Sequence, residues 1–425
     1  MSGSGLRTRE LDLNHTICRY GVVGHATVLS LSGKVKLESL QRLVPLGVEA
    51  IDDATKWLDR EDPESNTPIL LCDMSNVRYV ELPVLFYINA VVASHRASHR
   101  VLLRLPTEPD VIRFLVRWNY VKAFIDAAGS TSEHEVLRSG AEVYRESVNA
   151  LATLAEQRVT PDGQRVTLLP QQYYEIKSFP HTTALTSAFS SDIARAWNEQ
   201  HVVDVLRRLM GPERGKWVPH TILKPMLDNA LMHPQATVIQ HGAQHEGRLR
   251  HSLPLKIVLW DNGVSIVDTL REAMVSGDVV APTFDLTDIT IQVRVISREN
   301  GANVRVVEHI LRQKELSPLP DDPDWFVLIA ALMPGVSRRD PHDFEASAGI
   351  GLGLHQIASS VTHRYGGTLV IWTKDLYLCI RSAPSPYAYS VEVRVPESVD
   401  GDEHPEFAGN LLSVSLPDRA HGDSR

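Results

Sequence analysis

The order of apolar and polar residues along the chain predicts alternating strands and helices. Period-two alternation or short apolar runs predict strands at residues 26–33, 69–74 and 101–105. Helical spacing predicts helices at residues 37–58, 83–96 and 108–118. Strands that alternate with helices indicate a small α/β domain over residues 14–128, preceded by a flexible tail at residues 1–13.

The rest of the chain repeats this pattern in a second α/β region. Residues 129–174, which include a helical stretch at 135–158, are expected to connect the two regions. Beyond them we expect a strand at 173–179, helices at about 189–210 and 217–233, and paired strands at 237–240 and 256–260. We expect the second domain to span residues 175–397 and a flexible tail to follow at 398–425.

Composition narrows the function classes. Of 425 residues, 43 % are hydrophobic and 22 % charged, which is ordinary for a globular protein. The net charge of −9 gives no electrostatic reason to expect nucleic acid as a partner. Three widely spaced cysteines and the absence of a long apolar run favour a cytoplasmic protein that does not enter a membrane.

Two short patches in the second half carry candidate chemistry. Asn229 lies near the inner face of a predicted helix that ends at His233, and its amide oxygen could bind Mg²⁺, or could simply form a hydrogen bond in the core. Asp261 ends a strand, where its carboxylate could accept a hydrogen bond from the amino group of adenine. Gly263 would let a flat ring approach the backbone, although Asp-Asn-Gly is also an ordinary turn.

The third patch is a glycine-rich segment before a predicted helix. Its residues are Gly349, Gly351, Gly353 and Leu354. Glycines at a helix N-terminus expose backbone N–H groups to phosphate, although such a loop can also lack a ligand. No Lys-Ser/Thr pair follows, so the segment is not a P-loop.

Together the three patches resemble the ATPase superfamily of gyrase B, heat-shock chaperone ATPases, histidine kinases and mismatch-repair ATPases. Asn229 to His233 resembles the Asn box, Asp261 to Gly263 the first glycine box, and residues 349–354 the second. The resemblance implies a two-layer α/β sandwich that binds ATP and Mg²⁺ between helices and sheet, with Asn229 on the metal. It also implies a long lid over residues 266–348, in which residues 304–311 have the spacing of a helix. Arg338 and Arg339 in this lid could reach the γ-phosphate, or could simply be surface arginines.

The sequence departs from this family at catalytic and structural positions. The residue four places before Asn229, where the family carries a Glu that is often the general base, is Pro225. Asp228 points about 100° away from Asn229 on a helix. Ser265 replaces a glycine of the first box, and Ala388-Tyr389 stands where we expect the last box, next to a closing strand at 391–396. No catalytic residue is therefore assigned, although Glu345 in the lid is a conceivable base.

The first domain resembles the STAS fold of anti-sigma-factor antagonists and stressosome proteins. The strand at 69–73, the residues 75–77 and the helix from Pro83 follow that family's order. The phosphorylated Ser or Thr of signalling members is replaced by Glu81 and Leu82, so a phosphoswitch is not expected. Glu81 could mimic a permanent charge, but we favour a helix-capping role.

Two groups of histidines are assigned no catalytic or metal-binding role. His220 and Pro225 have the spacing of a phospho-accepting box, but they lie inside the Asn-box helix. His241, His245 and His251 are expected in a solvated hairpin loop rather than in a metal site.

The sequence thus predicts an ATP-binding regulatory protein whose lid closes on ATP and Mg²⁺. Closure would switch contact with a protein partner, through the STAS-like domain, or with that domain itself. A homodimer is possible. The alternatives are a working ATPase or an anti-sigma-type Ser/Thr protein kinase, and a scaffold that binds no nucleotide.

Overall fold

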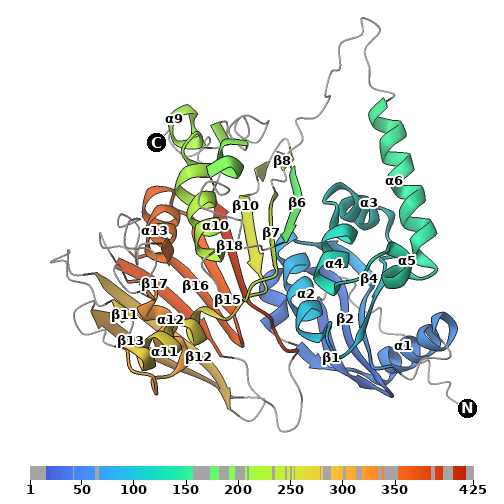
Figure 1. The fold of residues 1–425 in the computed structure, drawn as a ribbon, viewed down its shortest axis with the longest axis horizontal. Helices are drawn as coiled ribbons and strands as arrows, with labels where there is room; N and C mark the ends of the chain where they lie inside the picture. The colour runs from blue at the N-terminus through green and yellow to red at the C-terminus, as the bar shows by residue number, and fades with distance from the viewer. Residues whose placement is uncertain are drawn as a thin grey trace, which may run out of the picture.

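Two β-sheets with helices packed between and around them form this mixed α/β chain (Figure 1). The N-terminal unit comprises residues 16–156 and the C-terminal unit comprises residues 173–417. The computed structural model describes residues 16–41, 43–62, 67–156, 173–180, 191–196, 206–207, 210–231, 235–244, 247–248, 251–252, 254–277, 279–280, 289–299, 303–312, 318–333, 337–338, 353–383, 388–395 and 405–417.

The N-terminal unit is built on a five-stranded mixed sheet of order β3-β1-β2-β4-β5. Its strands are β1 (Ile17–Val23), β2 (Ala26–Val35), β3 (Leu43–Pro45), β4 (Ile69–Val80) and β5 (Arg100–Arg104). Its helices are η1 (Leu37–Gln41), α1 (Val48–Glu61), α2 (Leu82–His95), α3 (Pro109–Arg117), α4 (Tyr120–Ala128), α5 (Glu133–Leu137) and α6 (Gly140–Glu156). The single helix predicted at 37–58 is wrong, because β3 pairs with β1 between η1 and α1.

Residues 129–156 of the expected connector belong to the N-terminal unit. Helix α5 packs beside β5, and α6 packs against α3. The backbone N–H and the hydroxyl of Ser139 both donate to the Glu61 carboxylate, at 3.2 and 2.8 Å. The boundary placed at residue 128 is therefore too early. Residues 157–172, like the tail at 1–13, lie outside the described residues.

The C-terminal unit is built on a nine-stranded sheet of order β13-β12-β17-β16-β15-β18-β10-β7-β6. These strands are β6 (Tyr173–Pro180), β7 (Val238–Gln244), β10 (Leu255–Asp261), β12 (Thr290–Glu299), β13 (Asn303–Arg312), β15 (Thr368–Thr373), β16 (Leu376–Ser382), β17 (Ala388–Arg394) and β18 (Asn410–Leu416). The short strands β8 (Gly247–Arg248) and β9 (His251–Ser252) form a separate hairpin, and β11 (Val279–Val280) pairs with β14 (Ser337–Arg338).

Strand β18 corrects two expectations about the end of the chain. It lies between β10 and β15 in the middle of the sheet, so residues 405–417 are not a flexible tail. The closing strand expected at 391–396 is β17, which pairs with β12 and β16 and is separated from β10 by three other strands. The apolar side chains of β18 fill positions on both faces of the sheet, which makes this strand part of the core.

The expected lid contains strands of the same sheet. Strands β12 and β13 extend the sheet beyond β17, and residues 304–311, predicted as a helix, lie in β13. In the described part of this insert the helices are α11 (Ile266–Ser276) and α12 (Asp324–Ala330). The two strands enlarge the sheet, so only the remaining parts of 266–348 are available to cover a site.

Alternate residues of β10 face two different cores. Ile257 and Leu259 pack among the helices of the C-terminal unit, whereas Val258 and Trp260 pack in a core that includes α2 and α4 of the N-terminal unit. Such alternation is the pattern of a strand that is covered on both faces. The structure therefore joins the two units through one face of the large sheet (Figure 1).

Helix α2 has no polar face because both of its sides are covered. All but one of its 14 residues are buried, and it contacts β4 of its own sheet as well as β7, β10 and β18 of the other. A helix that is apolar all round is stable in water only when it is enclosed in this way. The sequence of α2 thus requires the second unit as a cover.

Buried polar contacts fix how the two units pack. The Asn89 amide donates to Gln240 Oε1 at 2.8 Å, and Gln240 Nε2 donates to the Ala123 carbonyl at 2.7 Å. Asn89 and Gln240 are both completely buried, where an unpaired amide would be costly. The side chain of Gln240 therefore connects β7 to α2 and α4 in one arrangement.

Glu81 occupies the N-cap position of α2 but does not cap it. Its carboxylate pairs with Lys256 of β10, at 2.7 Å, and accepts from Leu37 N at 3.4 Å. The N–H of Leu82 instead donates to Gln244 Oε1 of the C-terminal unit, at 3.0 Å. The capping role expected for Glu81 is wrong, and this charge belongs to the contact between the units.

His241 is another correction, because it lies in β7 and is completely buried rather than solvated. Its ring stacks on Phe179 with ring centroids 5.5 Å apart. Burial, assisted by the positive charge of Lys177, lowers the pKa of His241 to about 3. The imidazole is therefore neutral in the folded protein at neutral pH.

This depressed pKa predicts acid sensitivity. The unfolded chain binds a proton at His241 below about pH 6.5, whereas the folded chain does not until about pH 3. We expect the free energy of unfolding to fall by up to about 1.4 kcal/mol per pH unit from this group between those values. Urea unfolding of the wild type and of His241→Phe at pH 8 to 5 measures it. If the free energy of unfolding changed equally with pH in the two proteins, the prediction would be contradicted.

Among the described residues, none of the helices combines the length and apolar character needed to cross a membrane.

Candidate functional site

Two of the three predicted patches meet on the helical side of the large sheet. Asn229 lies on α10 (Lys224–Leu231), and Gly353 begins α13 (Gly353–Ser359), which packs against α10. A Cβ atom added at Gly353 would lie 3.8 Å from Asn229 Oδ1. Leu354 is buried in the core of the same helical layer. The fold therefore places the Asn229 amide at the N-terminus of α13.

A π-helical segment adjoins each of these helices. η2 (Pro219–Leu223) precedes α10 and η4 (Ser360–Arg364) follows α13. The Thr221 hydroxyl and Tyr365 OH are 3.1 Å apart, which ties the two segments together. Widened helical turns of this kind are often found at functional sites. His220 lies in η2, so it belongs to the Asn229 helix segment as expected.

Asp261 is completely buried at the end of β10. Its Oδ1 accepts from Gly263 N at 3.0 Å, which forms a local turn. Asn410 Nδ2 lies 3.3 and 3.5 Å from the two carboxylate oxygens. A buried carboxylate held by N–H donors is a strong acceptor in a fixed direction.

Asn410 is a site residue that the sequence interpretation missed. Its Oδ1 accepts from Ile266 N at 2.8 Å and from the Thr373 hydroxyl at 2.7 Å, while its Nδ2 also donates to the Val264 carbonyl at 3.1 Å. These bonds orient the amide so that its N–H groups face Asp261. Ala388 and Tyr389, the positions expected for the last box, lie in β17, where Ala388 pairs with Thr290 of β12, away from Asp261.

Asn262 and Ser265, the polar residues that follow Asp261, have structural roles. Asn262 Oδ1 accepts from the backbone N–H groups of Thr237 and Val238, both at 2.8 Å, which holds β10 against the start of β7. The Ser265 hydroxyl caps α11 by accepting from Asp268 N at 2.9 Å. A glycine could not supply this cap, which gives a physical reason for serine at this position.

Gly409 lets the chain pass against the backbone of Asp261. Its φ is +79°, and an added Cβ would stand 1.7 Å from the Asp261 carbonyl oxygen. Both the conformation and the close approach require glycine. Gly409 thus sets the position of Asn410 relative to the carboxylate.

We expect Gly409→Ala to destabilise the C-terminal unit and displace Asp261. The positive φ alone costs about 1–2 kcal/mol, and the overlap with Asp261 adds to it. Gly277→Ala is the matched control, because φ is +75° there and no atom lies within 4 Å of the added Cβ. Urea unfolding measures both variants. If Gly409→Ala lowered the free energy of unfolding no more than Gly277→Ala, the close approach of Gly409 to Asp261 would be unimportant for stability.

The described residues of this region supply no obvious general base. Pro225 is buried in α10 and carries no proton-accepting group. Asp228 forms an ion pair with Lys224 one turn earlier, at 2.6 Å. The His355 ring lies on α13, where Nδ1 is 3.1 Å from the Leu332 carbonyl and burial lowers the pKa of the ring. His355 therefore links α13 to the end of α12 as a neutral side chain.

The remaining predicted site residues are only partly described. Gly263 follows Asp261 in the turn, and Arg338 lies in β14, where it pairs with Val279 of β11. His233, Gly349, Gly351, Arg339 and Glu345 lie outside the described residues. Within the described residues, no group of three or more His, Cys, Asp or Glu side chains is arranged to hold a metal. An amide oxygen such as that of Asn229 fits Mg²⁺ when phosphates and water complete the coordination.

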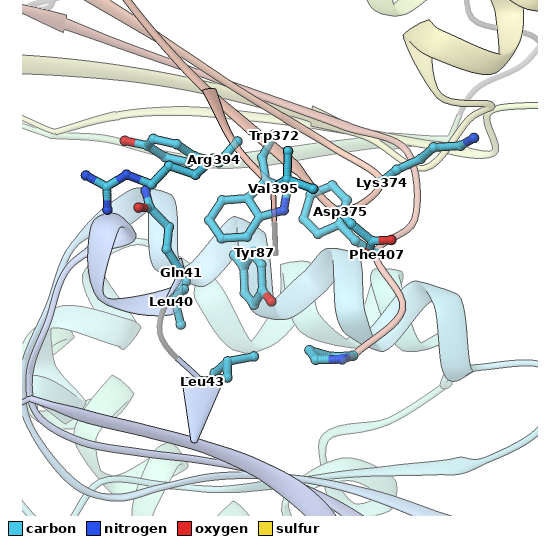
Figure 2. A pocket seen from close by; sticks show the side chains of 12 residues that line it. Leu40, Gln41, Leu43, Tyr87, Trp372, Lys374, Asp375, Arg394, Val395 and Phe407 are labelled. Carbon is cyan, nitrogen blue, oxygen red and sulfur yellow. The ribbon is translucent and has the colours of Figure 1, made fainter. Parts of the chain in front are cut away.

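A small cavity lies between the two units rather than beside Asp261. Tyr87 of α2, Trp372 of β15 and Phe407 face one another in it, with Gln41 and Arg394 at one end and Lys374 and Asp375 at the other (Figure 2). Its volume is about 50 Å³, whereas ligand sites typically have about 300–1,000 Å³. It is too small for a nucleotide, so the geometry around Asp261 and Asn229 carries the functional argument.

Comparisons of the chain with family models, with curated proteins and with solved structures found no match.

Proposed function

We propose that the C-terminal unit binds ATP and Mg²⁺ as a regulatory ligand. The observation that carries this proposal is the buried Asp261 carboxylate, which Gly263 and Asn410 hold at the end of a strand. It would accept a hydrogen bond from the amino group of adenine. Asn229 beside Gly353 would place Mg²⁺ and the phosphates at the N-terminus of α13.

A regulatory role fits the chain better than catalysis. The general base expected from the resemblance is replaced by Pro225, and the Asp228 carboxylate is paired with Lys224. A water molecule beside the γ-phosphate would then lack a proton acceptor from α10. We propose binding without rapid hydrolysis, and ATPase or protein kinase activity is the alternative.

Residues 405–410 supply a direct route from the site to the N-terminal unit. The N–H of Ala408 donates to the Ala90 carbonyl of α2 at 3.3 Å, and the Ala408 carbonyl accepts from Trp260 Nε1 at 2.9 Å. The next two residues are Gly409 and Asn410, which contact Asp261. A shift of Asp261 on nucleotide binding would therefore move backbone that is bonded to α2. This supports a switch in which the N-terminal unit, STAS-like in its sequence, responds to ATP and contacts a protein partner.

Calorimetric titration with ATP and with a non-hydrolysable analogue, with and without Mg²⁺, tests the proposal. Phosphate release is then measured on the same sample. We expect Mg²⁺-dependent binding without appreciable turnover. Turnover would identify an ATPase, and the absence of binding would leave a scaffold and refute the proposal.

A further inference from the structure

Strand β13 ends the large sheet on the side away from the N-terminal unit (Figure 1). Within the described residues, β12 is its only strand neighbour. It is ten residues long, and two of its apolar side chains are exposed, Ile310 at 69 % and Val306 at 40 %. A long edge strand with exposed apolar residues is a template for pairing with another strand.

The exposed face of β13 carries a regular pattern of charge. Glu308, Ile310 and Arg312 are exposed, whereas the alternate residues His309 and Leu311 are partly buried toward α12, where His309 stacks on Trp325. On the neighbouring strand Arg294 stands opposite Glu308. The exposed face therefore presents an acidic and a basic residue that flank an apolar one.

We infer that β13 pairs antiparallel with β13 of a second copy of this chain, about a two-fold axis at Ile310. In this register Ile310 faces the partner's Ile310. Glu308 faces the partner's Arg312, and Arg312 faces the partner's Glu308. Opposite charges directly across an antiparallel pair stabilise it, and the exposed isoleucines become buried against each other.

Charge selects this register over its neighbours. Two-fold antiparallel pairing brings residues of the same parity face to face, so the register changes in steps of two. One alternative register places Glu308 opposite the partner's Glu308, which is repulsive. Another places Glu308 opposite the partner's Ile310, without a counter-charge. In the chosen register the row across the dimer reads Arg294, Glu308, then the partner's Arg312, so each charge has an opposite neighbour.

Cysteine cross-linking tests the register. The three natural cysteines are buried, so they give little background. In the proposed dimer an Ile310→Cys variant brings two thiols directly opposite each other, with Cβ atoms about 4.5–5.5 Å apart. In a Val306→Cys control on the same face, the two thiols are roughly 26 Å apart along the strands. We expect mild oxidation to give a covalent dimer of the first variant and not of the second.

Charge exchange tests the pairing without a cross-link. Light scattering and sedimentation should show a concentration-dependent dimer of the full-length chain. We expect Arg312→Glu to raise the dimer dissociation constant at least tenfold, and Val275→Lys, at an apolar site exposed to 76 %, to leave it unchanged. The double variant Glu308→Arg/Arg312→Glu should dimerise more tightly than Glu308→Arg alone, since both carry the same repulsion with Arg294.

Each contrary result overturns the inference. A chain that stays monomeric at high concentration would do so, as would a dimer that Arg312→Glu leaves unchanged. Equal cross-linking of the Ile310→Cys and Val306→Cys variants would place the contact elsewhere.

Discussion

We expect Asp261→Ala to weaken nucleotide binding strongly. The amino group of adenine would lose its acceptor in a buried setting, which costs about 1–3 kcal/mol, or roughly 5- to 150-fold in affinity. Gly263 N and Asn410 Nδ2 would lose the same acceptor, which would loosen the turn that shapes the site. Calorimetric titration with ATP and Mg²⁺ measures the loss. Affinity equal to that of the wild type would rule out the pocket.

A subtler variant separates recognition from damage to the fold. Asp261→Asn keeps the size of the side chain but replaces one acceptor oxygen with an N–H donor. It should weaken the binding of ATP more than the binding of GTP, because ATP presents an amino group where GTP presents a carbonyl oxygen at the same ring position. Asp110→Asn, at a carboxylate exposed to 79 %, is the control for a general effect of charge. Parallel losses for both nucleotides would indicate structural damage instead.

The sequence predicted the parts of the fold that depend on local pattern. The strand that ends at Asp261 and the helix that carries Asn229 lie where apolar spacing placed them. The meeting of Asn229 and Gly353 agrees with the order of the patches. The strand and the helix depend on residues within one element, whose periodicity the chain displays directly.

Errors arose where distant segments decide the structure. The spacing of Val304, Val307 and Leu311 fits a helix, but β-branched residues and pairing with β12 make this segment a strand. Strand β18 follows a polar stretch and lies in the segment that the sequence predicts as a tail, although Leu411, Leu412 and Val414 form an apolar run. Its place between β10 and β15 is non-local information that no window of sequence contains.

Local sequence patterns also do not predict the contact between the two units. The apolar character of α2 indicates that it is buried, but not that part of its cover comes from β7 and β10. The partners of Asn89 and Glu81 lie more than a hundred residues away, at Gln240 and Lys256. Local pattern therefore predicted a helix cap at Glu81, which is one half of an ion pair between the units.

Two adjacent residues of β10 should separate the folding of the C-terminal unit from its contact with the N-terminal unit. Trp260 and Leu259 are both completely buried, but they face opposite sides of the sheet. We expect Trp260→Ala to cost about 3–5 kcal/mol and Leu259→Ala about 2–5 kcal/mol in unfolding free energy. Trp260→Ala also removes the Nε1 bond to the carbonyl of Ala408, the residue whose own N–H donates to Ala90 of α2.

Hydrogen exchange then distinguishes the two variants where stability alone does not. In Trp260→Ala we expect faster exchange of α2 amides, because the cavity lies between α2 and the sheet. In Leu259→Ala the faster exchange should appear in α10 and α13, with α2 unchanged. If the α2 amides exchange equally fast in both variants, the two units unfold as one cooperative block. Nucleotide binding could then not loosen the contact between the units without unfolding both. A response confined to Trp260→Ala would make β10 the element through which Asp261 and the N-terminal unit are coupled.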